Sequence, residues 1–369
     1  MTVDVGGGYG MNHLFDALNA GGDPDGIVLR MPGGEVKSYR DLWAQAGTAA
    51  KLLAQLGVKP GDRVSLQAEK HPLSLILYLA TLQVGAIFIP LNTAYTTAEV
   101  DYFLGDTVPT VFICDPARFD ELQPVAQRNS IPVVRTLAAD GGGTLPDALA
   151  AVEPGDEVVA ARRPDDIAAI LYTSGTTGRP KGAMLSHDNL LSNTQTLRSL
   201  WRFTPQDVLL HALPIYHAHG LFVACNIVML AGASMIFLPR FEADAVVDGF
   251  EHATSMMGVP TFYTRLLQNA RLTPEAAAGM RLFISGSAPL LAETHDAWRR
   301  KTGHTILERY GMTETTMITS NPYEGARIPG SVGRALDGVR VRVADRESGR
   351  VLGDGEIGVV ELAGPNVFK

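Results

Sequence analysis

The chain contains one run that constrains its fold and chemistry more than any other, residues 172–181, which read Tyr-Thr-Ser-Gly-Thr-Thr-Gly-Arg-Pro-Lys. The preceding segment, 166–171, is largely apolar and predicts a buried strand. Glycine allows backbone amides to converge on an anion, hydroxyl groups add hydrogen-bond donors, and Lys181 adds a mobile positive charge. The run therefore predicts a phosphate-binding loop at the end of a strand.

The spacing within this loop differs from that of the P-loop. In a P-loop, four residues separate the two glycines and Lys directly follows the second, whereas Gly175 and Gly178 enclose two residues here. This spacing disfavours a Walker-type NTPase. A mobile Ser/Thr/Gly surface turn remains the alternative interpretation of such a composition.

The length, charge and cysteine content of the chain limit the kinds of protein that it can be. With 369 residues, 46% hydrophobic and 19% charged, the chain can bury a sizeable core in two or three subdomains. Its net charge of -8 argues against nucleic acid or an anionic membrane as the main partner. The two cysteines, Cys114 and Cys225, lie in apolar runs and indicate buried thiols in a reducing cytoplasm. We expect no signal peptide at residues 1–10, and we interpret 221–238 as a buried helix followed by a strand rather than a membrane span.

The order of apolar segments predicts an α/β fold. In the first half, expected strands alternate with expected helices, which favours a parallel sheet with helices on its faces. The strands expected there are 63–67, 86–90 and 111–114, with helices at 73–84 and 97–104. In the second half the expected strands 255–259, 282–284 and 305–308 each lead into a helix or a small-residue turn, which is where open α/β sheets bind ligands. Short alternating runs after Val332 predict a small β-barrel or β-sheet.

Three histidines fall between His211 and Phe222 and raise the question of a metal site. His217 and His219 lie two residues apart with Gly220 following, which is neither the helical i, i+4 pair nor a zinc-finger spacing. No Asp, Glu or Cys stands close to these histidines, so the pattern disfavours a metal.

Four blocks of this sequence, in order, resemble the motifs of the adenylate-forming superfamily, which comprises acyl-CoA synthetases, luciferases and the adenylation domains of peptide synthetases. The blocks are Thr173–Lys181, the region of His217, Ser285–Pro289 and Tyr310–Glu314. The resemblance implies the large N-terminal domain of that fold, with parallel sheets flanked by helices in layers and a small β subdomain. It also implies ATP-dependent conversion of a carboxylate to an acyl-adenylate and then to an acyl-CoA, with release of pyrophosphate and AMP. We accordingly expect a flexible tail at 1–10 and subdomains at 11–165, 166–330 and 331–369.

The resemblance also assigns roles to residues. Lys181, His217, Thr173 and Glu314 would be catalytic, and Thr173 and Glu314 would hold Mg²⁺. The nucleotide would be bound by the phosphate loop and by the two later blocks, namely Thr173, Ser174, Gly175, Thr176, Thr177, Gly178, Lys181, Ser285, Gly286, Ser287, Ala288, Glu308, Arg309, Tyr310, Gly311, Met312 and Thr313. The structural alternatives are core packing for Tyr310 and a solvated carboxylate at a helix start for Glu314.

Within the superfamily, the strings 213–222, 257–267 and 282–290 look most like those of malonyl-CoA or methylmalonyl-CoA synthetases. Amino-acid-activating domains need an acid to meet the substrate ammonium, yet residues 256–267 contain no Asp or Glu and do contain Arg265. An arginine fork matches a second carboxylate.

The acid would therefore be bound by His217, Arg265, Ser285 and Met312, with Arg281 as a competing arginine. Arg281 precedes its strand, so we expect it at the amino edge of the sheet, away from the ligand edge. A CoA ligase for another short-chain or aromatic acid is the alternative function.

The superfamily has a second, mobile domain after a hinge, whereas this chain stops at residues 364–369. That domain would be the natural intramolecular partner, and it carries a lysine that contacts the reacting carboxylate. We therefore expect the chain to bind ATP and acid but to turn over poorly, and a non-catalytic nucleotide-binding module is an alternative. ATP, Mg²⁺ and coenzyme A are the expected small-molecule partners of a cytoplasmic enzyme.

Overall fold

The computed structural model describes residues 12–155, 158–173 and 179–369. The chain divides into two compact units. Unit 1 comprises the chain up to Ala20 together with Arg40–Asp188, and unit 2 comprises Gly21–Tyr39 and Asn189–Lys369. The subdomain limits expected at residues 165 and 330 stay predictions.

Unit 1 is built around a six-stranded sheet. Its strands are β3 (Arg63–Gln67), β4 (Ile87–Pro90), β5 (Val111–Cys114), β6 (Val133–Thr136), β7 (Ile167–Thr173) and β8 (Lys181–Ser186). The spatial order is β6-β5-β3-β4-β7-β8, and every neighbouring pair is parallel except β7 with β8. The parallel sheet predicted from the alternation of strands and helices is thereby confirmed.

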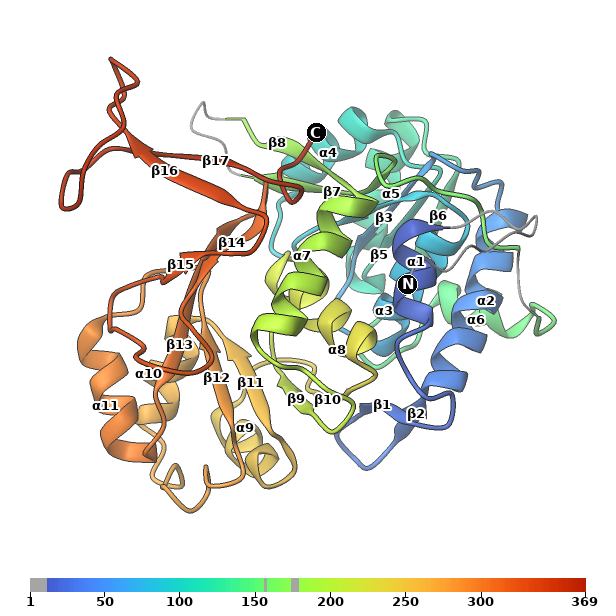
Figure 1. The fold of residues 1–369 in the computed structure, drawn as a ribbon. Coiled ribbons are helices and arrows are strands. Elements are labelled where there is room, and N and C mark those ends of the chain that lie inside the picture. The colour runs from blue at the N-terminus through green and yellow to red at the C-terminus, as the bar shows by residue number, and fades with distance from the viewer. Residues whose placement is uncertain (1–11, 156–157, 174–178) are drawn as a thin grey trace, which may run out of the picture. The chain divides into compact units, whose positions relative to one another are not determined.

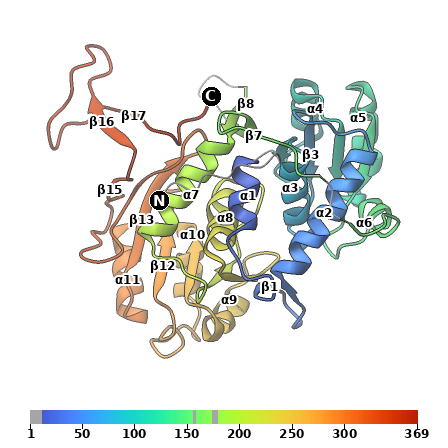
Figure 2. The ribbon, with the colours of Figure 1, turned by 45° about the vertical axis from the view of Figure 1, so that its right-hand side comes forward.

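Helices cover both faces of this sheet (Figure 2). They are α1 (His13–Asn19), α2 (Tyr39–Gln55), α3 (Pro72–Gln83), α4 (Thr97–Thr107), η1 (Pro116–Arg118), α5 (Phe119–Arg128) and α6 (Thr144–Ala150). Phe88 of β4 contacts Tyr78 of α3, whereas the next residue, Ile89, belongs to the buried cluster that contains the apolar residues of α4 and α5. Since successive side chains of a strand point to opposite faces, α3 lies on one face and the α4–α5 pair on the other.

Unit 2 contains a nine-stranded sheet. Its strands are β1 (Ile27–Arg30), β2 (Val36–Ser38), β9 (Val208–His211), β10 (Ser234–Phe237), β11 (Ser255–Gly258), β12 (Leu282–Ser285), β13 (Ile306–Met312), β14 (Thr316–Ser320) and β15 (Arg334–Ala335). The order is β15-β14-β13-β12-β11-β9-β10-β1-β2, and the strands from β13 to β1 are parallel. The carboxyl ends of β9, β11, β12 and β13 therefore share one edge.

The remaining helices of the chain are α7 (His187–Leu200), η2 (His219–Cys225), α8 (Asn226–Ala231), α9 (Ala243–Gly249), η3 (Phe250–His252), α10 (Pro260–Leu267) and α11 (Ala292–Thr302). Trp298 of α11 makes edge-on ring contacts with Tyr263 of α10 and Phe283 of β12, so α10 and α11 pack on the same face of the sheet (Figure 1). The apolar stretch 221–238 folds as the π-helix η2, helix α8 and strand β10, which confirms a buried helix followed by a strand. Throughout the described residues, every helix is too short or too polar to cross a bilayer.

Strand β13 differs from its prediction. We expected the strand to end at Glu308 and to lead into a helix or a turn, but β13 continues to Met312 and pairs with the antiparallel strand β14. The register shifts between Tyr310 and Gly311, which is a β-bulge. Pairing with β14 supplies the hydrogen bonds that an irregular segment would lack, and that pairing is not visible in the local sequence.

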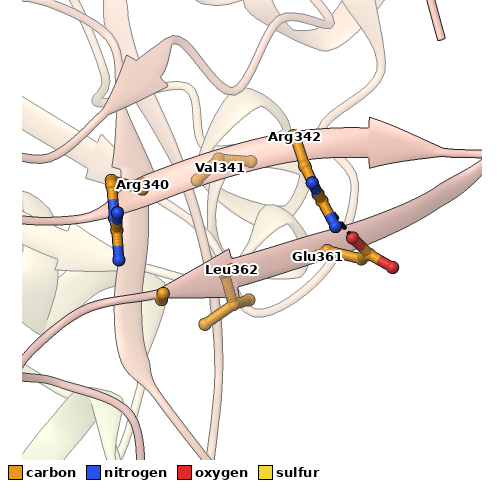
Figure 3. A pocket seen from close by; sticks show the side chains of 6 residues that line it. Arg340, Val341, Arg342, Glu361 and Leu362 are labelled. Atoms are coloured by element: carbon orange, nitrogen blue, oxygen red, sulfur yellow. Dashed lines mark hydrogen bonds and ion pairs between the residues drawn. The ribbon is translucent and has the colours of Figure 1, made fainter. Parts of the chain in front are cut away.

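The alternating runs after Val332 form a two-stranded antiparallel ribbon, β16 (Arg340–Ala344) and β17 (Val359–Ala363). Arg342 and Glu361 face each other across it, and Arg342 Nε donates to Glu361 Oε2 at 2.6 Å (Figure 3). Of the two forms predicted for this segment, the structure therefore contains the sheet.

Candidate active site

Three parallel strands of unit 2 lie side by side, so the residues at their carboxyl ends lie close together. Gly258 at the end of β11 lies opposite Ser285 at the end of β12, which in turn lies opposite Glu308 in β13. The predicted turn 285–289 follows β12 directly, and Ser287 within it has a φ of +70°. A serine in this left-handed region costs conformational energy and marks a constrained position.

A cavity of about 360 Å³ opens at this edge of the sheet. It is lined by the start of η2 and its preceding loop, by the ends of β11 and β12, and by β13 and β14. The lining residues are Leu213, Pro214, His217, Ala218, His219, Gly220, Val259, Ser287, Arg309, Gly311, Met312, Thr313 and Met317. Predicted residues from three of the four motif blocks thus lie in or beside one cavity, at the carboxyl edge where open α/β sheets bind ligands.

Arg309 is the most unusual residue among those that line the cavity. The residue is 3% exposed, and none of its three side-chain nitrogens has a hydrogen-bond partner among the described residues. Burial lowers the pKa of Arg309 to about 9, so the group remains charged at neutral pH. A buried charge without a partner is costly, and an anion entering the cavity would relieve that cost.

His219 is the second buried polar group of the wall. Its Nδ1 lies 3.3 Å from Ser287 Oγ, and its Nε2 has no partner among the described residues. Burial and the nearby charge of Arg309 hold the pKa of His219 well below its ordinary value, so the ring is neutral. If the Ser287 hydroxyl donates to Nδ1, Nε2 carries the proton and can donate to a ligand.

The other two histidines of this window have different environments. His217, the predicted catalytic histidine, lies exposed on the cavity wall with its ring 4.7 Å from that of Tyr216. His211 is buried, and its Nε2 lies 2.7 Å from the carbonyl oxygen of Gly220. His211 therefore stabilises the first turn of η2, and the described residues contain no cluster of three His, Cys, Asp or Glu side chains suited to a metal.

The block 310–314 lies at the end of β13 and in the turn to β14. Gly311, Met312 and Thr313 line the cavity. The Tyr310 side chain is 39% exposed, so core packing of Tyr310 is excluded and its ring is free to stack on a ligand. Glu314 is half-buried in the β13–β14 turn, so the helix-start alternative for this carboxylate is wrong.

The remaining nucleotide residues predicted in unit 2 surround this cavity without lining it. Ser285 and Gly286 are buried, whereas Ala288 is exposed on the turn. Glu308 is 5% exposed and accepts a hydrogen bond from the backbone N–H of Gly330 at 3.0 Å. Burial raises the pKa of Glu308 despite that hydrogen bond. These positions hold the turn and the strand that carry the lining residues.

The predicted phosphate loop falls between two antiparallel strands of unit 1, β7 and β8, unlike the strand-to-helix loop of P-loop proteins. Thr173 ends β7 and Lys181 begins β8, and the two residues lie opposite each other. Lys181 is exposed and Thr173 is half-buried. The predicted residues Ser174, Gly175, Thr176, Thr177 and Gly178 lie outside the described residues.

The two arginines predicted to compete for the acid differ in position. Arg281 lies at the amino edge of the sheet as expected, where its Nε donates to Asp207 Oδ1 at 2.6 Å. Arg265 lies exposed on α10 with its guanidinium 4.7 Å from the ring centre of Phe241, and it is not among the residues that line the cavity. Its role in binding the acid stays a prediction.

Sequence reasoning missed two features of the site. Arg309 was expected among the nucleotide-binding residues, and that role stays a prediction, but the sequence did not show that its charge is buried without a hydrogen-bond partner among the described residues. His219 was weighed only as a possible metal ligand beside His217, so its burial next to Arg309 was not predicted. One sequence signal for the burial of Arg309 was present, because the strand that carries it begins with the apolar residues Ile306 and Leu307.

Comparison with known proteins agrees with this geometry. The sequence matches the AMP-binding enzyme family over residues 17–369. The mitochondrial malonate–CoA ligase ACSF3 of Mus musculus is 35% identical over 329 residues, which are 83% of this chain and 55% of that ligase. Feruloyl-CoA synthase of Amycolatopsis is 31% identical over 344 residues, which are 91% of this chain and 67% of that enzyme. The chain thus spans little more than half the length of the malonate–CoA ligase.

Among solved structures, ATP-bound MatB from Rhodopseudomonas palustris matches with a TM-score of 0.94 and 55% sequence identity, over 97% of this chain and 71% of that chain. The predicted fold class and the resemblance to the adenylate-forming superfamily are confirmed by these matches. The cytoplasmic location expected for this chain stays a prediction.

Proposed function

Since the chain belongs to the AMP-binding enzyme family, we propose that it uses ATP to activate a small dicarboxylic acid, malonate or methylmalonate. One carboxylate attacks the α-phosphate of ATP, pyrophosphate leaves, and coenzyme A then displaces AMP from the acyl-adenylate. The reaction brings two anions together, so the protein must supply cations and aligned donors rather than a nucleophile.

The buried guanidinium of Arg309 is the observation that carries the proposed substrate. A carboxylate that stays free while the other one reacts would pair with this guanidinium, whose fork geometry matches two carboxylate oxygens. His219 Nε2 offers a further donor beside it. A monocarboxylic acid of the same length would leave the Arg309 charge buried and unpaired. The names of the malonate–CoA ligase relatives support the same substrate class.

For the nucleotide, we propose that Lys181 and the loop beginning at Thr173 bind the phosphates, and that Glu314 and Thr173 hold Mg²⁺. Glu314 suits this role because its carboxylate is half-buried and its own backbone carbonyl accepts a hydrogen bond from the Phe368 N–H at 2.9 Å, which anchors the turn. Magnesium prefers such oxygen ligands and, when bound, neutralises phosphate charge.

A panel of acids tests the proposed substrate. In calorimetric titrations with AMP present, we expect malonate and methylmalonate to bind more tightly than propionate or benzoate, and pyrophosphate release from ATP to follow the same order. Tighter binding of benzoate or ferulate would favour the alternative, a ligase for aromatic acids, which the similarity to feruloyl-CoA synthase supports.

Two substitutions test the nucleotide site. Lys181→Met and Glu314→Gln should each weaken ATP binding or adenylation by on the order of 100-fold, because each removes a fixed charge from the phosphate site. Glu314→Gln should also weaken the dependence on magnesium. The melting temperature should stay nearly unchanged because loop charges contribute little to stability. A large drop in melting temperature with unchanged ATP binding would contradict these roles.

A further inference from the structure

We propose that Gly286 determines the specificity of this site by leaving the space that the Arg309 guanidinium occupies. A side chain at position 286 would force the guanidinium out of its buried position beside Gly286 and so remove the preference for a dicarboxylic acid. This inference rests on the proposed function, because it takes Arg309 as the group that binds the second carboxylate.

The side chain of Arg309 lies very close to the backbone of Gly286. A Cβ atom at Gly286 would lie 2.5 Å from Arg309 Nε, and it would be closer still to Cζ and Nη1. Carbon atoms pack at about 3.5–4.0 Å, so the side chain and this Cβ would overlap by about 1 Å. Gly286 is not among the glycines with positive φ, so its backbone conformation does not itself require glycine. The requirement comes from the guanidinium.

The turn is held more firmly than the guanidinium, so the guanidinium would yield. The Gly286 N–H donates to the carbonyl oxygen of Gly258 at 3.3 Å, and the preceding Ser285 pairs in register with Gly258 and Glu308. By contrast, the Arg309 guanidinium makes no hydrogen bond to any described residue. Its displacement would break no hydrogen bond, whereas displacement of Gly286 would disturb the end of β12.

A substitution cycle tests this coupling. Gly286→Ala, Arg309→Met and the double variant are titrated with malonate and with propionate in the presence of AMP. We expect Gly286→Ala to weaken malonate binding by about 30-fold and propionate binding by less than about threefold, because truncating or displacing one partner of a desolvated charge pair has an effect of this size. In the double variant malonate should bind no more weakly than in Arg309→Met alone.

Two controls keep the result interpretable. Gly279→Ala is the matched control, because Gly279 is exposed, lacks positive φ and has only one atom within 4 Å of its Cβ position, the Phe250 carbonyl oxygen at 3.9 Å. It should leave both affinities unchanged. Adding Arg309→Lys to Gly286→Ala should restore part of the malonate affinity, since the compact ammonium needs less room than the guanidinium. This rescue requires a folded protein and excludes unfolding as the cause of the loss.

The outcomes separate this inference from the proposed function. If Gly286→Ala keeps wild-type malonate affinity while Arg309→Met loses it, the role of Gly286 is wrong and that of Arg309 stands. If the two losses multiply in the double variant, Gly286 acts independently of Arg309 and the inference is again wrong. If Arg309→Met binds malonate like the wild type, the proposed function loses its main support, and the inference falls with it.

Discussion

Two arginines of unit 2 lie at opposite edges of the same sheet and have opposite environments. Arg281 precedes β12 at the amino edge, where it forms an ion pair with Asp207 and its Nη1 donates to the carbonyl oxygen of Trp201 at 3.0 Å. Arg309 lies in β13 toward the carboxyl edge, where the residue lines a cavity and its buried guanidinium has no partner among the described residues. The fold neutralises the first charge itself, whereas the described residues provide no counter-charge for the second.

The pKa values of Arg281 and Arg309 shift in opposite directions. Burial alone would lower the pKa of Arg281, but the hydrogen bond and charge of Asp207 raise it above its ordinary value. Burial lowers the pKa of Arg309, and Tyr263 opposes this without cancelling it. A charge that is compensated within the fold serves stability, and one that is not compensated is a candidate for function.

Among substitutions that test the contrast between the two arginines, Arg309→Met should have the largest effect. It should weaken malonate binding by at least ~30-fold, corresponding to about 2–5 kcal/mol, because the free carboxylate loses its buried partner. Propionate should bind as well as before or better. The free energy of unfolding should stay equal or rise, since an uncompensated buried charge is removed. Calorimetry with both acids and urea unfolding measure these quantities, and a marked loss of stability would mean that Arg309 has a structural role like that of Arg281.

His187 in unit 1 shows a third way to bury an ionisable group, which is to keep it neutral. The residue is fully buried, neither ring nitrogen has a partner among the described residues, and burial lowers its pKa from 6.5 to about 4, with Arg162 and His13 lowering it further and Asp166 opposing. The unfolded chain takes up a proton below pH 6.5, whereas the folded chain does so only near pH 4.

Stability from His187 is therefore fully present above pH 6.5 and is lost as the pH falls toward 4, by about 3 kcal/mol at about 1.4 kcal/mol per pH unit. Urea unfolding at several pH values measures this slope, and His187→Leu should flatten it. Equal slopes for the two proteins would show that His187 is not protonated differently on folding.

Asp207→Asn tests the compensated side of the comparison. The carboxylate is 4% exposed and accepts hydrogen bonds from Arg281, from the Thr254 hydroxyl and from the Thr204 backbone N–H. Its replacement leaves Arg281 without a counter-charge and should lower the free energy of unfolding by about 1–3 kcal/mol. Malonate affinity should be unchanged, because the pair lies at the amino edge. Loss of malonate binding without loss of stability would reverse the assignment of the two arginines.

Arg265→Met is expected to have the smallest effect. Its guanidinium is exposed over the ring of Phe241, and exposed charge pairs contribute about 0–1 kcal/mol. We therefore expect malonate affinity to fall by no more than about fivefold. A loss of ~30-fold, as large as that expected for Arg309→Met, would show that Arg265 closes on the acid and shares the second carboxylate.

Much of the fold follows from short stretches of sequence. Strands 63–67 and 111–114 were predicted with the limits that the structure has, because β-branched and apolar residues bounded by turn signals specify a strand locally. The topological argument that placed Arg281 at the amino edge was also correct, since chain order alone fixes which end of a parallel strand a residue precedes.

Other features depend on residues far apart in the chain. Strand β1 (Ile27–Arg30) pairs with β10 (Ser234–Phe237), more than 200 residues away, so the early segment 21–39 belongs to unit 2. Strand β13 extends to Met312 because β14 pairs with it.

The environment of Arg309 also depends on residues that are far apart in the chain. The sequence itself shows an arginine at position 309 and the motifs around it. Its guanidinium is buried beside Gly286 without a partner among the described residues, and the residue lines a cavity, because three strands and a π-helix meet at one edge. Local propensity determines which residues form an element, but burial and charge compensation depend on which elements pack together, and only the tertiary structure decides that.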